Sequence, residues 1–212
     1  KITVLGGGSW GTALAGALSA KGLTVSLLLR GAAQAEEINS RHLNSRYLPG
    51  IRLDDSLRAT TCADEAFADA GLCLLAVPCQ SMRAVLAPLA SRFLPGMPVV
   101  CASKGLELGS LKTMSGVVRE ELPQARYAIL SGPSFAREVA LGMPSALVMG
   151  CAEKGLGEEL RDVFSTSRVR VYSSVDVTGV EIGGAIKNVI AIAAGVSDGL
   201  GFGHNARAAL IT

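Results

Sequence analysis

Aromatic residues are scarce in this chain, and neither sign of charge dominates. Phe, Trp and Tyr together make up 4% of the 212 residues, and the formal net charge is +2. Proteins that bind single-stranded nucleic acid stack its bases on aromatic side chains, and phosphate backbones attract broad basic surfaces. The composition supplies neither feature, so we expect no nucleic-acid partner.

Closely spaced cysteine pairs are also lacking. The five cysteines are scattered, odd in number and without the spacing of a zinc or redox motif: Cys62, Cys73, Cys79, Cys101 and Cys151. Cys62, Cys73 and Cys101 fall in apolar strand-like runs, where cysteine packs as a small hydrophobic residue. This usage is typical of a reduced cytoplasmic protein, and we expect no metal site.

No apolar run reaches membrane-spanning length, because Lys, Asn or Pro interrupts the longest ones. The chain opens on a predicted strand, without the charged and then apolar segments of a secretory leader. We therefore expect neither a transmembrane helix nor a signal peptide. The hydrophobic share of 49% and the mean hydropathy of +0.39 are still high, which indicates apolar surfaces that pack against other parts of the protein.

The clearest motif stands near the N-terminus. A short apolar run over residues 2–5 leads into Gly6, Gly8 and Gly11, the spacing G-x-G-x-x-G, and a helix is predicted over residues 9–20. In such a turn the first glycine allows the tight turn, the second lets backbone approach a pyrophosphate, and the third permits close helix packing. The helix N-terminus then presents N–H groups to the phosphates. A second apolar run over residues 25–29 completes the order expected of a dinucleotide site.

No acid follows this second run, where a site for NAD usually places Asp or Glu against the ribose 2′-hydroxyl. Arg30 stands there instead, and a guanidinium pairs well with a 2′-phosphate. We therefore favour NADPH as the cofactor, with NADH as the second choice. A solvated arginine at a strand end is the alternative interpretation of Arg30.

Strand-like runs and helical patterns alternate along the rest of the chain. This order predicts an α/β fold, a Rossmann-type doubly wound and mostly parallel sheet. Helices are predicted over residues 81–93 and 114–122, and the strand-like runs are residues 60–62, 72–77, 99–102, 127–130, 146–149 and 169–172.

Ligands bind such sheets beyond the carboxyl ends of the strands, so the residues that follow the strands are candidates. Lys104 follows the run that ends near residue 102, and its ammonium could meet a phosphate or a carbonyl oxygen. Gly132 and Ser134 lie in a turn after residue 130, where backbone N–H groups and a hydroxyl that doubles as a helix cap are available. Taken singly, a solvated lysine and a simple helix cap are the more common interpretations.

A long helix is predicted from residue 176 to about residue 196, and it carries Lys187 among apolar neighbours. Burial there would lower the pKa of the lysine from about 10.4 toward neutrality, where it can act as general acid or base. Gly183, Gly184 and Ala185 would allow another backbone or a ligand to come close. The alternative is that Lys187 reaches solvent from a packed helix.

Taken together, several segments resemble the NAD(P)-dependent sn-glycerol-3-phosphate dehydrogenases, and the bacterial biosynthetic type most. The matching segments appear in order and span the whole chain: VLGGGSWGTALA (4–15), ASKGLE (102–107), SGPSFA (131–136), GAIKNVIAI (184–192) and residues 195–212. The resemblance implies interconversion of dihydroxyacetone phosphate and glycerol 3-phosphate by hydride transfer, which feeds glycerophospholipid synthesis in the cytoplasm. It is also compatible with a homodimer.

The resemblance further implies a role for individual residues. Lys187 would donate and accept the proton at the carbonyl, Lys104 would contact cofactor and substrate, and both are thereby catalytic candidates. Gly132 and Ser134 would contact the substrate. The cofactor would be held by the glycine turn together with Ser9, Trp10, Arg30, Tyr47 and Ala136.

The resemblance also implies two domains, a dinucleotide-binding domain over residues 1–174 and the start of a helical substrate-binding domain over residues 175–212. The family continues past the last matching residue, and that further region carries a catalytic aspartate and a Ser-Arg-Asn motif. We therefore expect these 212 residues alone to bind dinucleotide weakly and to show little turnover. The alternatives are another two-domain Rossmann dehydrogenase, of ketopantoate or hydroxyacyl type, and an inactive dinucleotide-binding module.

Overall fold

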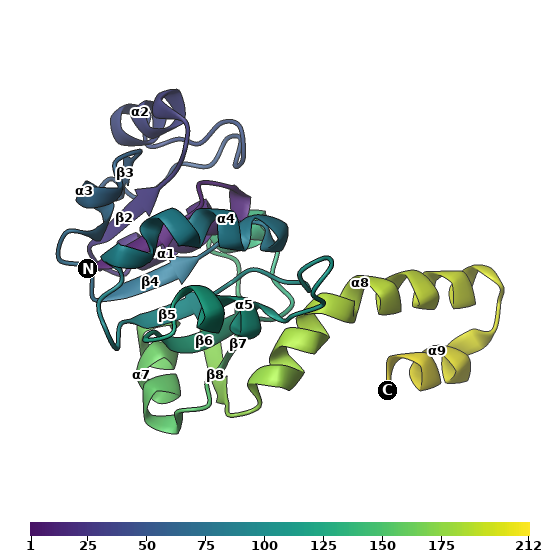
Figure 1. Cartoon of the computed structure of the whole chain (residues 1–212). Coiled ribbons are helices and arrows are strands. Elements are labelled where there is room, and N and C mark those ends of the chain that lie inside the picture. Colours follow the sequence, from purple (N-terminus) through teal and green to yellow (C-terminus); the bar gives the residue numbers. More distant parts are fainter.

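Eight strands form one sheet in a computed structural model that describes all residues from Lys1 to Thr212 (Figure 1). The strand order is β3-β2-β1-β4-β5-β6-β7-β8, so the order reverses between β1 and β4. Neighbouring strands are parallel except for β6 and β7. The strands are β1 (Ile2–Leu5), β2 (Val25–Leu28), β3 (Arg58–Thr60), β4 (Leu72–Leu75), β5 (Pro98–Cys101), β6 (Arg126–Ser131), β7 (Ser145–Gly150) and β8 (Val169–Ser174).

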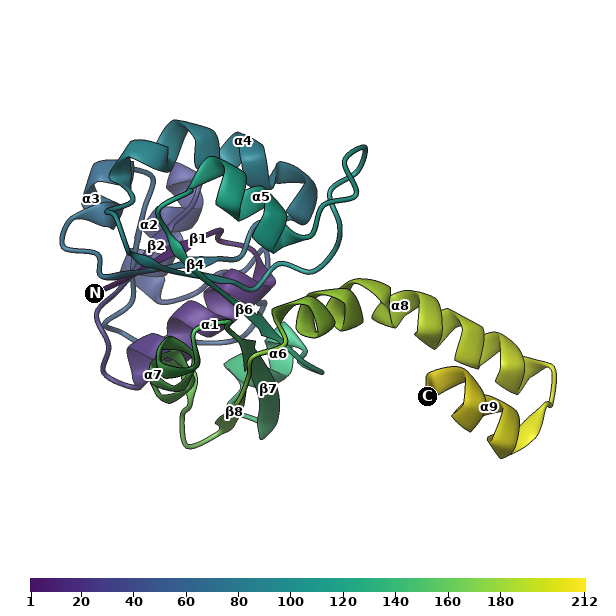
Figure 2. The same cartoon turned by 60° about the horizontal axis from the view of Figure 1, so that its bottom comes forward.

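Helices connect these strands and cover both faces of the sheet (Figure 2). The α-helices are α1 (Ser9–Ala20), α2 (Ala32–Arg41), α3 (Ala63–Phe67), α4 (Met82–Leu86), α5 (Met114–Glu121), α6 (Ala136–Ala140), α7 (Lys154–Phe164), α8 (Val177–Gly199) and α9 (Gly203–Ile211). Two 3-10 helices, η1 (Cys79–Ser81) and η2 (Ala87–Arg92), flank α4. The expected Rossmann-type sheet is confirmed.

The alternation of side chains along the central strands divides the core into two layers. Leu72 and Leu74 of β4 face the layer under α1, α6 and α7, whereas Cys73 and Leu75 face the layer under α3, α4 and α5. Because successive strand residues point to opposite faces, near-continuous apolar strands are needed when both faces are buried. This explains the uninterrupted apolar runs of the sequence.

Two local predictions are wrong. The helix expected over residues 81–93 is split into α4 and η2, because Pro88 near the start of η2 lacks the N–H that an α-helix needs. The strand expected over residues 60–62 is also wrong, because β3 already ends at Thr60. Cys62 is exposed and forms the N-cap of α3. Cys73 and Cys101 are fully buried, as expected of core cysteines.

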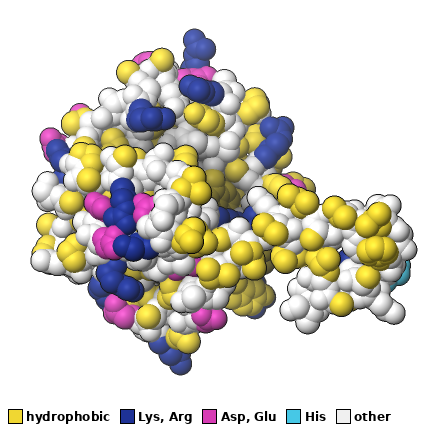
Figure 3. Space-filling view, turned by 45° about the vertical axis from the view of Figure 1, so that its right-hand side comes forward, with side chains coloured by type: hydrophobic (Ala, Val, Ile, Leu, Met, Phe, Trp, Pro, Cys, Tyr) yellow, Lys and Arg dark blue, Asp and Glu magenta, His cyan; other side chains and the backbone are white.

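The helix α8 leaves the sheet and forms, with α9, an arm that projects from the molecule (Figure 2). Hydrophobic side chains run along this arm (Figure 3), and they include Val189, Ile192 and Val196, which are 66%, 69% and 56% exposed. By length and composition alone, α8 is apolar enough to cross a membrane, although core helices of soluble proteins pass the same test. The expected absence of a transmembrane segment therefore stays a prediction.

Candidate active site

The glycine turn between β1 and α1 is shaped by its first and third glycines. Gly6 has φ +116°, and a Cβ built there would lie 2.6 Å from the carbonyl oxygen of Ala76. A Cβ on Gly11 would collide with the carbonyl of Gly6. A Cβ on Gly8, by contrast, would meet nothing within 4 Å. Gly6 and Gly11 thus serve the fold of the turn, while Gly8 leaves its outer side open.

Polar contacts fix the turn from the outside. Asn44 is fully buried, and its side-chain Nδ2 donates to the carbonyl of Gly7 at 3.2 Å and to Thr12 Oγ1 at 2.8 Å. The Ser9 hydroxyl donates to the backbone carbonyl of Tyr47 at 2.9 Å. Ser9 and Tyr47, which are far apart in sequence, are therefore neighbours at the mouth of the turn. Sequence reasoning missed Asn44, because no local pattern distinguishes a buried asparagine from an exposed one.

Trp10, in the first turn of α1, packs partly against the core, and its indole Nε1 is buried without a hydrogen-bond partner. Ala136, the first residue of α6, packs against the same core cluster. Arg30 is exposed just beyond the end of β2, on the side of the sheet where the glycine turn lies. Its position is the one that the argument for a 2′-phosphate requires, although the choice between NADPH and NADH stays a prediction.

Lys104 lies just after β5, at the same carboxyl edge of the sheet. Its Nζ donates to the carbonyl of Gly132 at 2.8 Å, so the loops after β5 and β6 meet. The side chain is half-buried, and this burial, followed by the nearby positive charge of Lys187, lowers the pKa of Lys104. A partly desolvated ammonium beside a second cation lacks a counter-charge, which favours binding of an anion there.

The turn after β6 differs in part from expectation. Gly132 has φ +141°, and a Cβ there would lie 2.9 Å from the carbonyl oxygen of Ala146, so glycine is needed. Ser134 was expected to cap the following helix, but the N-cap of α6 is Phe135 and no side chain caps it. The Ser134 hydroxyl instead approaches its own turn, 3.4 Å from the carbonyl of Gly132. It thus lies beside Lys104 and is open to other partners.

Lys187 lies in the middle of α8 and its side chain is exposed, which agrees with the interpretation in which this lysine reaches solvent and not with the one in which it is buried. The outer part of α8 projects away from the sheet (Figure 1), and the exposure of the Lys187 side chain means that no neighbouring element covers it. Of the two glycines before it, Gly184 alone makes a close approach. A Cβ on Gly184 would lie 2.9 Å from Ser131 Oγ and 3.5 Å from Lys104 Cγ, whereas Gly183 faces open space.

The close approach of Gly184 brings α8, the end of β6 and Lys104 together. A buried acid fixes this junction: Glu181, 7% exposed, accepts hydrogen bonds from Ser115 N at 2.7 Å, Ser115 Oγ at 2.7 Å and Tyr127 Oη at 2.8 Å. Glu181 therefore ties the first turns of α8 to the N-terminus of α5 and to β6. The sequence contains one indication of this role of Glu181: it is an acid on the same apolar helix as Lys187.

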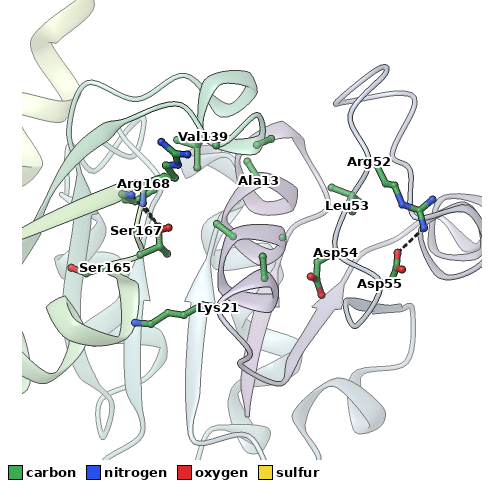
Figure 4. Close-up of a pocket in the computed structure, with 17 residues that line it drawn as sticks. Ala13, Lys21, Arg52, Leu53, Asp54, Asp55, Val139, Ser165, Ser167 and Arg168 are labelled. Carbon is green, nitrogen blue, oxygen red and sulfur yellow. Dashed lines mark hydrogen bonds and ion pairs between the residues drawn. The ribbon is translucent and has the colours of Figure 1, made fainter.

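A large cleft lies elsewhere, along α1 between the loops around residues 52–55 and 165–169 (Figure 4). It measures about 770 Å³. Its charged groups are mostly used within the protein, since Lys21 donates to two carbonyls at the end of α7 and Arg52 pairs with Asp55. None of the residues expected to bind cofactor or substrate lines it. We therefore place the candidate site at the carboxyl edge of the sheet.

Known protein families match both parts of this chain. The family model for the N-terminus of NAD-dependent glycerol-3-phosphate dehydrogenase matches residues 1–156, and the model for its C-terminus matches residues 176–212. A glycerol-3-phosphate dehydrogenase [NAD(P)+] of Nitratidesulfovibrio vulgaris is 58% identical over all of this chain, and the chain spans 65% of that protein.

Solved structures show the same likeness. The crystal structure of glycerol-3-phosphate dehydrogenase from Coxiella burnetii is 37% identical with a TM-score of 0.87, over 99% of this chain and 64% of that one. The yeast enzyme GPD1 is 30% identical with a TM-score of 0.89, over 99% of this chain and 66% of that one. The chain thus spans about two thirds of the length of such relatives. By its sequence and its fold, it belongs to the family of NAD-dependent glycerol-3-phosphate dehydrogenases.

Proposed function

We propose that the intact protein interconverts dihydroxyacetone phosphate and sn-glycerol 3-phosphate with NADPH or NADH. One observation carries this proposal: Lys104, Gly132 and the helix of Lys187 meet at the carboxyl edge of the sheet. They meet after β5 and β6, which lie two and three strands from the β1 of the glycine turn. Such an edge, next to the point where the strand order reverses, is where doubly wound sheets bind their ligands.

The residues of the glycine turn fit a dinucleotide. The outer side of Gly8 is open, so a pyrophosphate could approach the backbone there, and α1 begins directly behind it with unpaired N–H groups. The buried, unpartnered Nε1 of Trp10 lies in the same turn and could donate to a bound group. Tyr47 and Arg30 would flank the adenosine end, and Ala136 would contact the cofactor from α6.

When bound, nicotinamide supplies the hydride to the ketone carbon, or accepts it from the alcohol in the reverse direction. Hydride addition turns the carbonyl oxygen into an alkoxide, and the Lys187 ammonium would give that oxygen a proton, so that the alcohol forms and the amine is left neutral. The positive charge of Lys187 also stabilises the developing oxyanion before the proton moves. Its exposed position on α8 allows this approach, since a substrate can reach it.

Lys104 would bind the substrate phosphate. Its ammonium donates to the Gly132 carbonyl. Burial, and after it the nearby charge of Lys187, give the positive charge of Lys104 a cost in free energy, and this cost lowers its pKa. A dianionic phosphate would relieve this cost by pairing with the charge. The Ser134 hydroxyl, which approaches only the Gly132 carbonyl, is free to turn toward the same phosphate.

We further propose the domain division at residues 174 and 175. The strand β8 ends at Ser174 and α8 begins at Val177, and the apolar side chains on the α8–α9 arm are exposed. The curated relatives are about one half longer than this chain, and their additional residues are the natural cover for this face. A homodimer, a cytoplasmic location and a role in glycerophospholipid synthesis belong to the same proposal.

The test is a rate measurement on the full-length protein. We expect addition of dihydroxyacetone phosphate to start oxidation of NADPH, and addition of ketopantoate or an acyl-CoA ketone to leave it unchanged. Oxidation of NADPH with ketopantoate or an acyl-CoA ketone, but not with dihydroxyacetone phosphate, would favour the alternative of a ketopantoate-type or hydroxyacyl-type dehydrogenase. Binding of NADPH without reduction of any ketone would favour an inactive dinucleotide-binding module.

A further inference from the structure

Lys104 is carried by a long connection without regular structure. Residues 103–113, here called the lysine loop, join β5 to α5 and contain no helix or strand. The tip of the loop makes little contact with the core, since Leu108 and Leu111 are 77% and 71% exposed. Core packing therefore does not hold the loop in place, and its position must come from polar contacts.

The first set of contacts comes from Gln80 in η1. Its side-chain Nε2 donates to the carbonyl of Leu106 at 2.8 Å, and its Oε1 accepts from the backbone N–H of Leu108 at 2.9 Å. One amide group thus satisfies a backbone acceptor and a backbone donor of the lysine loop. On the other side of Lys104, the Ser103 hydroxyl donates to the carbonyl of Val77 at 2.5 Å. Lys104 is therefore held between two anchors on the same neighbouring segment.

The second set comes from Arg83 in α4. Its guanidinium donates to both carboxylate oxygens of Glu107, from Nε at 2.7 Å and from Nη2 at 3.1 Å. Such a paired arrangement fixes direction as well as distance. The remaining N–H groups reach Glu120 at 2.5 Å and Glu121 at 2.9 Å on α5, so Arg83 also ties the loop to the helix that follows it. The hydrogen bonds from Arg83 are the main cause of the lowered pKa of Glu107.

The segment that holds the lysine loop also supports the glycine turn. Ala76 donates its backbone N–H to the carbonyl of Leu5 at 2.9 Å, and it is the residue against which Gly6 and Gly11 pack closely. Residues 76–83 therefore touch both the proposed cofactor turn and the loop of the proposed phosphate-binding lysine. A shift of this segment would change the distance between the two halves of the site.

We propose that Gln80 and Arg83 are positioning residues, which hold the lysine loop so that Lys104 Nζ stays at the Gly132 carbonyl and beside Lys187. This inference rests on the proposed function of Lys104. Neither residue is expected to touch substrate or cofactor. Their effect is geometric, and displacement of a substrate-binding cation by about 1 Å can lower a rate by up to about a hundredfold.

The test compares the full-length protein with its Gln80→Leu, Arg83→Ala and Arg83→Lys variants. The matched control is Arg92→Ala. Arg92 lies in η2 on the same layer, is 31% exposed against 34% for Arg83, and pairs with Asp64 at 2.8 Å, away from the lysine loop. We expect Gln80→Leu and Arg83→Ala to raise the KM for dihydroxyacetone phosphate about tenfold, with a much smaller change in the Kd of NADPH.

Arg83→Lys should recover part of the loss, because it keeps the charge near the acids but cannot bridge both oxygens of Glu107. Arg92→Ala should leave the kinetic constants within about twofold, as is usual for surface ion pairs. A second readout is independent of activity: hydrogen exchange of the Leu108 amide and its neighbours should become faster in Gln80→Leu and Arg83→Ala only.

Unchanged exchange in the lysine loop would overturn the proposal, and so would an unchanged KM or an equal loss in Arg92→Ala. A full-length protein that does not reduce dihydroxyacetone phosphate would contradict the proposed function instead. In that case the exchange measurement would still decide whether Gln80 and Arg83 hold the loop.

Discussion

The glycines of the N-terminal turn differ in their backbone angles and in the atoms that a Cβ would meet. Gly6 is required by its φ of +116° and by the carbonyl of Ala76, whereas Gly8 has φ −75° and ψ −179°, which any residue adopts, and open space where a Cβ would stand. Neither backbone strain nor a steric clash thus requires a glycine at position 8. A ligand that comes close to the backbone is the remaining reason for it.

The substitution Gly8→Ala should separate these two roles. We expect it to change the free energy of unfolding by less than about 0.5 kcal/mol and to weaken NADPH binding about tenfold or more, because the new methyl group meets the pyrophosphate. Gly6→Ala is the comparison, and should cost about 1–3 kcal/mol of stability through its backbone strain. Urea unfolding and NADPH titration measure the two effects. Tight NADPH binding by Gly8→Ala would contradict the assigned pyrophosphate position.

The pH dependence of phosphate binding tests the environment of Lys104. Because its pKa is lowered, first by burial and then by Lys187, it loses its proton at a lower pH than an ordinary lysine, whose pKa is about 10.4. The affinity for glycerol 3-phosphate should therefore fall as the pH rises through this lowered value. Lys187→Met removes the like charge and should shift the fall to higher pH. A shift to lower pH, or none, would contradict the repulsion between the two lysines.

At the scale of elements, the sequence already indicated the parallel sheet, the glycine turn and the residues at the carboxyl edge. Both faces of the sheet are covered, so the strands appear as apolar runs that can be recognised locally. The contact between Lys104 and Gly132, and the anchoring of Glu181 on α5, could not be predicted, because they join residues that only the fold brings together. The sequence left the burial of Lys187 open, because periodicity does not reveal whether another element covers a helix, and the structure shows this side chain exposed.

Glu181 determines how α8 is attached, so its loss should loosen that helix. Glu181→Ala leaves the Tyr127 hydroxyl and the Ser115 N–H without their acceptor in a mostly buried place, and we expect a loss of about 2–3 kcal/mol in the free energy of unfolding. Glu181→Gln keeps one acceptor oxygen and should cost less. A double-mutant cycle with Tyr127→Phe, followed by urea unfolding, measures the coupling. Additive effects would contradict a direct contact.

At the scale of the whole molecule, the sheet is well covered, and the α8–α9 arm is not. Exposed apolar side chains follow the arm from Ile186 to Ile211, far more than a few isolated surface residues (Figure 3). This explains the high apolar content of the sequence. Lys187 of the proposed site is itself an exposed residue of this arm.

The 212 residues should therefore behave differently from the full-length protein. We expect them to bind NADPH weakly, to bind a hydrophobic dye on the arm, and to turn over dihydroxyacetone phosphate little or not at all, since nothing covers Lys187 or the apolar face. The matched comparison is the full-length protein, which should bind less dye and be active. Turnover by the 212 residues close to that of the full-length protein would refute this division of the site.

The central claim is that Lys187 delivers the proton while Lys104 holds the phosphate, and the most direct measurement is steady-state reduction of dihydroxyacetone phosphate by the full-length Lys187→Ala and Lys104→Ala variants. We predict that Lys187→Ala lowers kcat by about a hundredfold or more with little change in KM, and that Lys104→Ala mainly raises KM. A Lys187→Ala protein that keeps its kcat would contradict the account.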